Sequence, residues 1–200
     1  MYYAEFHTDK YIREKFFPNF SETHTMVEVG AGPPQFYSMS KHFRDHRWRC
    51  ICIEPNPKFI EQHKQLNHEI YQYACSNEEK ISQFQIINTG WEQSINGISY
   101  SSLTPKYDIV DQHTTETIEV SVVKLDTLLS NLNIESVDFV SIDTEGWELE
   151  VMKGFNSNKY KPKVILLENY LYDDKYVSFM EEQGYALDTA LKYNYIFTRK

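Results

Sequence analysis

The chain has no apolar run that approaches the ~18 residues of a membrane-spanning helix. Residues 1–17 mix acidic and basic side chains without the apolar centre of a signal peptide. There are only three cysteines, Cys50, Cys52 and Cys75, and an odd count without a CxxC pair gives no disulfide framework. We therefore expect a soluble cytoplasmic protein with buried, reduced thiols and no membrane span.

Basic side chains are also scarce. The 20 lysines and arginines are outnumbered by 29 aspartates and glutamates, so the formal net charge is −9. Proteins that bind nucleic acid or anionic lipid must neutralise phosphates with lysine and arginine. We therefore expect no nucleic-acid partner, whereas the oligomeric state stays open.

Glycine and proline are few, seven of each, and they are scattered rather than clustered into linkers. There is no internal repeat, and the apolar share of 41% is that of a folded chain. Two hundred residues are enough to bury a full core. The expectation is therefore a single domain over residues 1–200, opened by an N-terminal helical segment within residues 1–24.

Apolar strands alternate with helical segments along most of the chain, which is typical of βαβ units. The fold class predicted is α/β and Rossmann-like, with a mostly parallel central sheet, helices on both faces and a C-terminal antiparallel hairpin. Residues 88–116 are polar and loop-like, and we expect them to form a substrate-facing insertion. The expected strands are residues 25–29, 48–53, 69–74, 82–87, 117–123, 137–142, 163–167, 185–191 and 193–198.

The strongest local signal is the sequence Glu28-Val29-Gly30-Ala31-Gly32 at the end of the first strand. Small residues let the backbone turn tightly and approach a ligand at the mouth of a parallel sheet. Taken alone, the two glycines are also compatible with an ordinary turn. A dinucleotide site favours GxGxxG, and the third glycine is missing here.

Glu54 ends the second strand, where an acid can accept both hydroxyls of a ribose in charge-assisted hydrogen bonds. Together, the glycine turn and this acid indicate a site for an adenosine-containing cofactor. Without the third glycine, S-adenosylmethionine fits better than NAD. Asn56 is placed either to contact the cofactor or to act as a helix N-cap, and both roles are compatible with this site.

Two further acids, Asp143 and Glu168, end later strands. Carboxylates at neighbouring strand ends can take a proton, hold an amine or bind a metal. Glu145 and Glu148 follow Asp143, but acids in a first helical turn also favour the helix dipole. Asp143, Glu145 and Glu168 have the chemistry to hold a divalent metal, yet no metal motif accompanies them, and we expect none.

Six motifs in order carry a resemblance to a known family. Read together, the chain resembles the FkbM family of S-adenosylmethionine-dependent methyltransferases. The motifs are E-V-G-A-G (28–32), I-E-P-N-P (53–57), A-C-S-N-E-E (74–79), S-S-L (101–103), V-S-V-V-K-L-D-T-L-L (120–129) and V-D-F-V-S-I-D-T-E-G-W-E-L-E-V-M-K-G (137–154).

The resemblance implies a methyltransferase fold with S-adenosylmethionine as the cofactor. It places Glu54 at the ribose hydroxyls and Asp143 near the methionine amine or the reacting centre. The remaining positions that it assigns to the cofactor are the methionine-end residues Glu28, Gly30, Ala31 and Gly32 and the adenine-side residues Ala74 and Cys75.

The family's acceptors, as the resemblance implies, include sugars and polyketide-type hydroxyls. We therefore predict O-methyl transfer to a sugar, glycan or similar small acceptor, with Asp143 and then Glu168 as the general base. Two alternatives remain: a binding module that keeps the cofactor fold without transfer, and methyl transfer to a polyketide-type or nitrogen acceptor. An NAD-dependent oxidoreductase is disfavoured by the missing GxGxxG.

Overall fold

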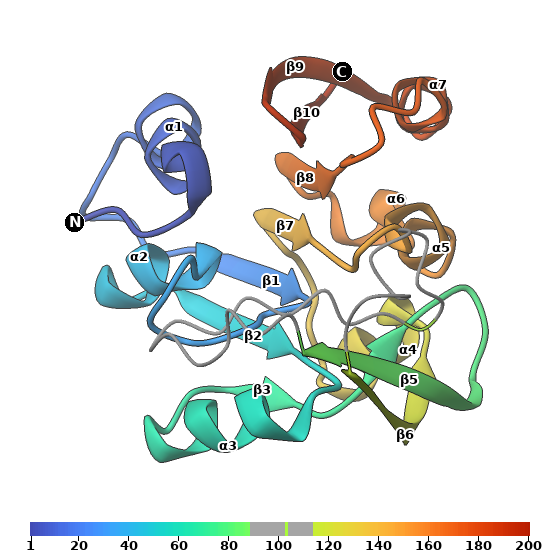
Figure 1. The fold of residues 1–200 in the computed structure, drawn as a ribbon. Helices are drawn as coiled ribbons and strands as arrows, with labels where there is room; N and C mark the ends of the chain where they lie inside the picture. The colour runs from blue at the N-terminus through green and yellow to red at the C-terminus, as the bar shows by residue number, and fades with distance from the viewer. Residues whose placement is uncertain (89–102, 104–113) are drawn as a thin grey trace.

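The computed structural model describes residues 1–88, 103 and 114–200, and a sheet of seven strands lies at its centre (Figure 1). The strands follow the spatial order β3-β2-β1-β7-β8-β10-β9. The first five are parallel, whereas β10 runs antiparallel to both β8 and β9. They are β1 (Thr25–Val29), β2 (Arg49–Ile53), β3 (Ile70–Tyr71), β7 (Phe139–Ile142), β8 (Val164–Glu168), β9 (Tyr185–Leu191) and β10 (Asn194–Arg199).

Helices cover both faces of this sheet, because successive residues of a strand point to opposite sides. On β1, Met26 belongs to one apolar cluster, whereas Val27 and Val29 belong to another. The Met26 cluster is completed by α1 (Thr8–Phe16) and α2 (Met39–Asp45). The other contains side chains of α4 (Leu125–Asn131), α5 (Glu148–Lys153) and α7 (Lys175–Glu182). The predicted α/β class, with its C-terminal antiparallel hairpin, is confirmed.

Three shorter strands form a second sheet in the order β4-β6-β5. They are β4 (Ala74–Cys75), β5 (Lys80–Asn88) and β6 (Thr114–Val123). The expected strand over residues 69–74 is therefore wrong in its second half. The chain turns after β3, where the Tyr73 N–H donates to the Tyr71 carbonyl oxygen at 3.1 Å, and Ala74 then pairs with β6. An apolar pattern predicts extended backbone but not which strand it pairs with.

The predicted insertion, residues 88–116, lies mostly outside the described residues. Its last residues begin β6, and Asn88 ends β5. Leu103 is described, and it packs against the apolar face of the second sheet. The role of this segment in facing a substrate stays a prediction.

The parallel strands β2, β1, β7 and β8 end at one edge of the sheet, since parallel strands share a direction (Figure 1). The glycine turn, Glu54, Asp143 and Glu168 therefore all come to this edge. Three further helices are described: η1 (Glu5–His7), α3 (Pro57–Gln65) and α6 (Ser157–Tyr160). Of these, α3 follows Glu54 directly along the chain.

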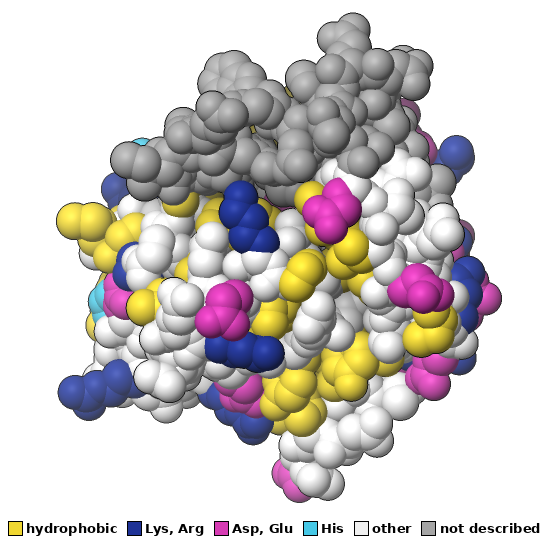
Figure 2. Space-filling model, turned by 60° about the horizontal axis from the view of Figure 1, so that its bottom comes forward, with side chains coloured by type: hydrophobic (Ala, Val, Ile, Leu, Met, Phe, Trp, Pro, Cys, Tyr) yellow, Lys and Arg dark blue, Asp and Glu magenta, His cyan; other side chains and the backbone are white. Residues whose placement is uncertain are grey.

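Charged side chains of both signs lie side by side on the face shown in Figure 2, and its described part carries no broad basic patch. This agrees with the net charge of −9. Within the described residues, every helix is too short or too polar to span a bilayer.

Candidate active site

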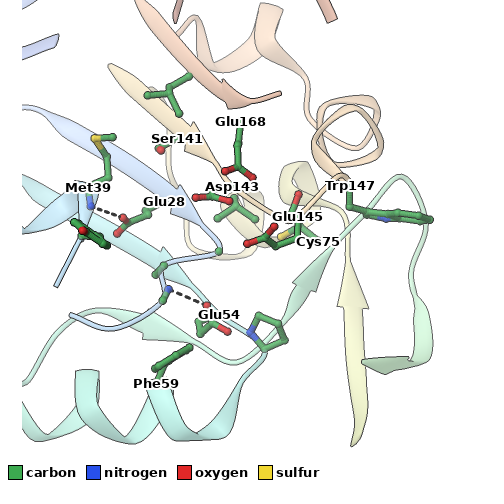
Figure 3. A pocket seen from close by; sticks show the side chains of 18 of the residues that line it. Glu28, Met39, Glu54, Phe59, Cys75, Ser141, Asp143, Glu145, Trp147 and Glu168 are labelled. Carbon is green, nitrogen blue, oxygen red and sulfur yellow. Dashed lines mark hydrogen bonds between the residues drawn. The ribbon is translucent and has the colours of Figure 1, made fainter. Parts of the chain in front are cut away.

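A cavity of about 220 Å³ opens at the edge where the parallel strands end (Figure 3). Its walls come from both sheets and from the N-terminal and C-terminal parts of the chain. The cavity thus brings together residues that are far apart in the sequence. The predicted site residues that line it are Glu28, Gly30, Ala31, Gly32, Glu54, Ala74, Cys75, Asp143 and Glu168.

Glu54 connects the glycine turn to the start of α3. One carboxylate oxygen accepts the Gly32 N–H at 2.9 Å, and the other accepts the Asn56 N–H at 2.8 Å. Because a carboxylate offers about four lone-pair sites, each oxygen keeps acceptor capacity toward the cavity. Burial raises the pKa of Glu54 to about 7, against the opposing effect of these two hydrogen bonds.

Glu28 is buried and holds the first turn of α2. Its Oε1 accepts the N–H groups of Met39 at 3.0 Å and Ser40 at 3.2 Å (Figure 3). These are the N–H groups that a helix start leaves without an internal partner, and they favour a negative charge. Burial is the largest effect on this carboxyl and raises its pKa. Glu28 therefore has a role in the fold, and its contact with a cofactor stays a prediction.

Asn56 lies beside the cavity rather than in its wall. Its side-chain oxygen accepts the Lys58 N–H at 3.0 Å and caps α3. The N-cap alternative is thus observed, while a cofactor contact of Asn56 stays a prediction. Ala74 and Cys75 line the cavity from β4, in the same wall as Phe84.

Three carboxylates meet in the middle of the cavity. Asp143 follows β7, Glu168 ends β8, and Glu145 lies in the loop after Asp143; Figure 3 shows them pointing toward one another. One oxygen from each lies within 4.8 Å of the other two. Asp143 is exposed where it faces the cavity, and the residues that line the cavity surround it.

The pKa of all three carboxyl groups is raised. Burial is the main cause in each case: it raises the pKa of Asp143 to about 7 and that of Glu168 to about 12, where repulsion from Asp143 and Glu145 adds to it. The pKa of Glu145 is also well above its usual value, because of burial first and repulsion from Asp143 second. Carboxyl groups perturbed in this way and gathered in a cleft are typical of catalytic and ligand-binding sites.

A family comparison agrees with this geometry. The model of the methyltransferase FkbM domain matches residues 28–187, which include both the glycine turn and the three carboxylates. The chain belongs to the FkbM methyltransferase family. It is therefore a methyltransferase.

The chain is similar in structure to a precorrin-6y C5,15-methyltransferase from Geobacter metallireducens GS-15, with 17% identity and a TM-score of 0.42. That similarity covers 89% of this chain and 80% of the other. No curated protein matches this sequence.

Four cavity-lining residues lie outside the segment matched by the FkbM domain: Ala4, Glu5, Tyr193 and Asn194. The Tyr193 hydroxyl donates to a Glu5 carboxylate oxygen at 2.6 Å, which connects the N-terminal segment to the hairpin turn. No motif in the sequence pointed to these residues, because only the packing of the two ends of the chain brings them to the site.

Aromatic rings surround this part of the cavity. The Phe36 and Tyr37 rings lie 4.0 Å apart, and the Tyr170 and Tyr193 rings lie 5.6 Å apart, measured between centroids. Tyr37 and Tyr170 are exposed, at 47% and 41%. An exposed tyrosine offers an apolar face and a polar tip, so these rings suit a ligand of mixed polarity.

Sequence reasoning assigned Glu148 only to a helix dipole, whereas the structure makes it the organiser of the loop after Asp143. Glu148 is fully buried. Its Oε1 accepts the N–H groups of Thr144 at 2.8 Å and Gly146 at 3.0 Å, and its Oε2 accepts the Tyr176 hydroxyl at 2.6 Å. Glu148 thereby fixes the loop that carries Glu145.

We expect Glu148→Ala to lower the free energy of unfolding by about 3 kcal/mol, because it leaves several buried donors without a partner. Urea denaturation followed by circular dichroism measures the change. Glu150→Ala is the matched control: Glu150 lies on the same helix and pairs with Lys153 near the surface, so its loss is expected to cost less than about 1 kcal/mol. Equal losses in the two variants would contradict the role of Glu148.

Proposed function

We propose that this FkbM-family enzyme is an S-adenosylmethionine-dependent O-methyltransferase that acts on a hydroxyl of a sugar, glycan or similar small acceptor. The observation that carries the proposal is that one cavity is lined by Glu54, by the carboxylates Asp143 and Glu168, and by aromatic rings. These rings are Phe36, Tyr37, Tyr170 and Tyr193. Methyl transfer needs the donor, the base and the acceptor in one place, since positioning supplies much of the catalysis.

The residues around Glu54 fit the cofactor. Its oxygens keep lone pairs for the two ribose hydroxyls after accepting the Gly32 and Asn56 N–H groups. Next to it, an apolar part of the wall suits an adenine ring; it is formed by Phe59, Ala74, Cys75, Phe84 and Leu103. When bound, S-adenosylmethionine supplies a methyl group on a positively charged sulfur, and the surrounding acids favour that charge.

The carboxylates and the aromatic rings fit an acceptor hydroxyl. A hydroxyl has a high pKa and benefits from a base while the new carbon–oxygen bond forms. Asp143, whose pKa is about 7, can take that proton near neutral pH, with Glu168 beside it. The rings of Tyr37 and Tyr170 can stack on the apolar face of a sugar.

A cytoplasmic location is part of the proposal. All three cysteines are buried and unpaired. Burial raises the pKa of Cys75 to about 12, so this thiol stays protonated and unreactive. Free thiols of this kind are usual in reducing compartments.

Glu54→Gln is expected to weaken the binding of S-adenosylhomocysteine roughly 30-fold, or about 2 kcal/mol. The reason is that the ribose hydroxyls would then donate to a neutral amide instead of a charged carboxylate. Isothermal titration calorimetry on the full chain measures the affinity. Glu61→Gln, an exposed acid on α3, is the control and should bind as the unaltered chain does. Absence of binding to the unaltered chain would reject the proposed function.

The same pair of proteins gives a pH test. Since the pKa of Glu54 is raised to about 7, the unaltered chain is expected to bind more weakly as the pH falls below 7 and this carboxylate gains a proton. Glu54→Gln should lose that part of the pH dependence. Other titrating groups, including Asp143, are shared by both proteins, so the difference between the two profiles isolates Glu54.

The acceptor is tested by transfer of a labelled methyl group to nucleotide sugars, free glycosides and glycolipids. We expect product with at least one of these sugar classes, as a base-stable methyl ether. Transfer to an amine or a polyketide-type hydroxyl, with no transfer to sugars, would favour the alternative of a polyketide-type or nitrogen acceptor. Tight binding of the cofactor without any transfer would favour a binding module.

A further inference from the structure

The three carboxylates of the cavity form a set of ligands for a cation. Asp143, Glu145 and Glu168 each offer an oxygen, and these oxygens lie within 4.8 Å of one another. Figure 3 shows the three side chains converging from the end of β7, the following loop and the end of β8. None of the ion pairs among the described residues supplies a lysine or arginine to this group.

A second observation comes from Glu168 alone. Its side chain is more than nine-tenths buried, with 8% exposure, and points into the cluster (Figure 3). Its Oε2 is fully buried and accepts no hydrogen bond from any N–H or hydroxyl group of the described residues; the group beside the Glu168 carboxyl is the carboxyl of Asp143. A buried carboxylate oxygen that accepts no N–H or hydroxyl is costly beside a second carboxylate, so the pair indicates a bound positive charge, either a proton or a cation.

We propose that Asp143, Glu145 and Glu168 bind one divalent cation of the oxygen-preferring class, such as Mg²⁺ or Mn²⁺. A donor set made only of carboxylate oxygens selects these hard cations over zinc or copper. Three protein ligands leave coordination positions for water and for an acceptor hydroxyl. The sequence alone led us to expect no metal, because these ligands form no local motif.

The cation deepens the proposed function and rests on it. The acceptor hydroxyl oxygen bonds to the methyl carbon, the carbon–sulfur bond breaks, and its electron pair stays on sulfur. The hydroxyl proton passes to a carboxylate oxygen that does not hold the cation, and from there to water. A divalent cation next to the hydroxyl lowers its pKa and so makes it a better nucleophile.

Titration of the full chain with Mn²⁺, followed by electron paramagnetic resonance of the free ion, tests the site without any substrate. We expect one bound Mn²⁺ per chain and competition by Mg²⁺. Glu145→Gln and Glu168→Gln should each weaken binding at least tenfold. Glu150→Gln is the matched control, since Glu150 lies on α5 and pairs with Lys153 outside the cluster.

Two results would overturn the cation site. One is no loss of the free Mn²⁺ signal, with or without S-adenosylhomocysteine; the other is equal binding by the unaltered chain and both cluster variants. In either case, calorimetry with S-adenosylhomocysteine still decides the proposed function separately. If S-adenosylhomocysteine binds and Mn²⁺ does not, the positive charge that these three carboxylates bind is the amine of the cofactor.

Discussion

Asp143→Asn is expected to lower the turnover number roughly a thousandfold at saturating S-adenosylmethionine. The amide cannot take the hydroxyl proton, yet it keeps the size and shape of the aspartate, so the cavity stays intact. The measurement is transfer of the labelled methyl group to the acceptor found by the sugar screen. Saturating cofactor separates this effect from any loss of the predicted contact with the methionine amine.

Glu168→Gln is expected to give a smaller loss, roughly tenfold to a hundredfold, because Glu168 lies beside Asp143 in the cluster and Asp143 is the group proposed to take the hydroxyl proton. Asp174→Asn, an exposed acid at the start of α7, is the control and should leave turnover unchanged. The assignment of the base is wrong if Asp143→Asn and Glu168→Gln both turn over as fast as this control. Their effects should not add, since the two residues work as a unit.

Gly30→Ala is expected to prevent stable folding or to lower the free energy of unfolding by at least about 4 kcal/mol. A Cβ at Gly30 would lie 1.7 Å from the backbone carbonyl oxygen of Asp143. That oxygen cannot move away easily, because the backbone of Asp143 is held in place. Its N–H donates to the Val29 carbonyl oxygen at 3.0 Å, where the pairing of β1 and β7 ends. Gly30 also has a φ of +79°, which costs an alanine further strain.

Gly32→Ala is the matched control for this prediction. Gly32 lies in the same turn and also has a positive φ of +53°, but a Cβ there would meet nothing within 4 Å. Only the backbone strain remains, and we expect a loss of about 1 kcal/mol. Urea denaturation of both variants measures the difference. Similar losses would show that backbone strain, rather than the contact with Asp143, makes Gly30 necessary.

Much of the sheet could be predicted because its signals are local. Strand β1 begins and ends where its apolar pattern does, and β9 with β10 form the expected hairpin around Lys192. The expected strand over residues 69–74 was wrong in part, because Tyr71 and Ala74 lie in one short segment but pair with strands of different sheets. Pairing depends on residues far along the chain, which periodicity does not report.

The sequence by itself determined the family, the glycine turn and the acids at the strand ends. This was possible because parallel strands carry their last residues to one edge, so order along the chain implies position in space. It named Asp143, Glu145 and Glu168 as acids with metal-binding chemistry, but it did not determine that their oxygens lie within 4.8 Å of one another, or that Glu28 holds a helix start.

Only the tertiary structure decided these points, and it alone brought Glu5 and Tyr193 together at the cavity. Each depends on contacts between segments far apart in the sequence, whereas a sequence pattern records neighbours along the chain. The closeness of the three acids is a property of that packing, and it favours the cation site that was not expected from the sequence.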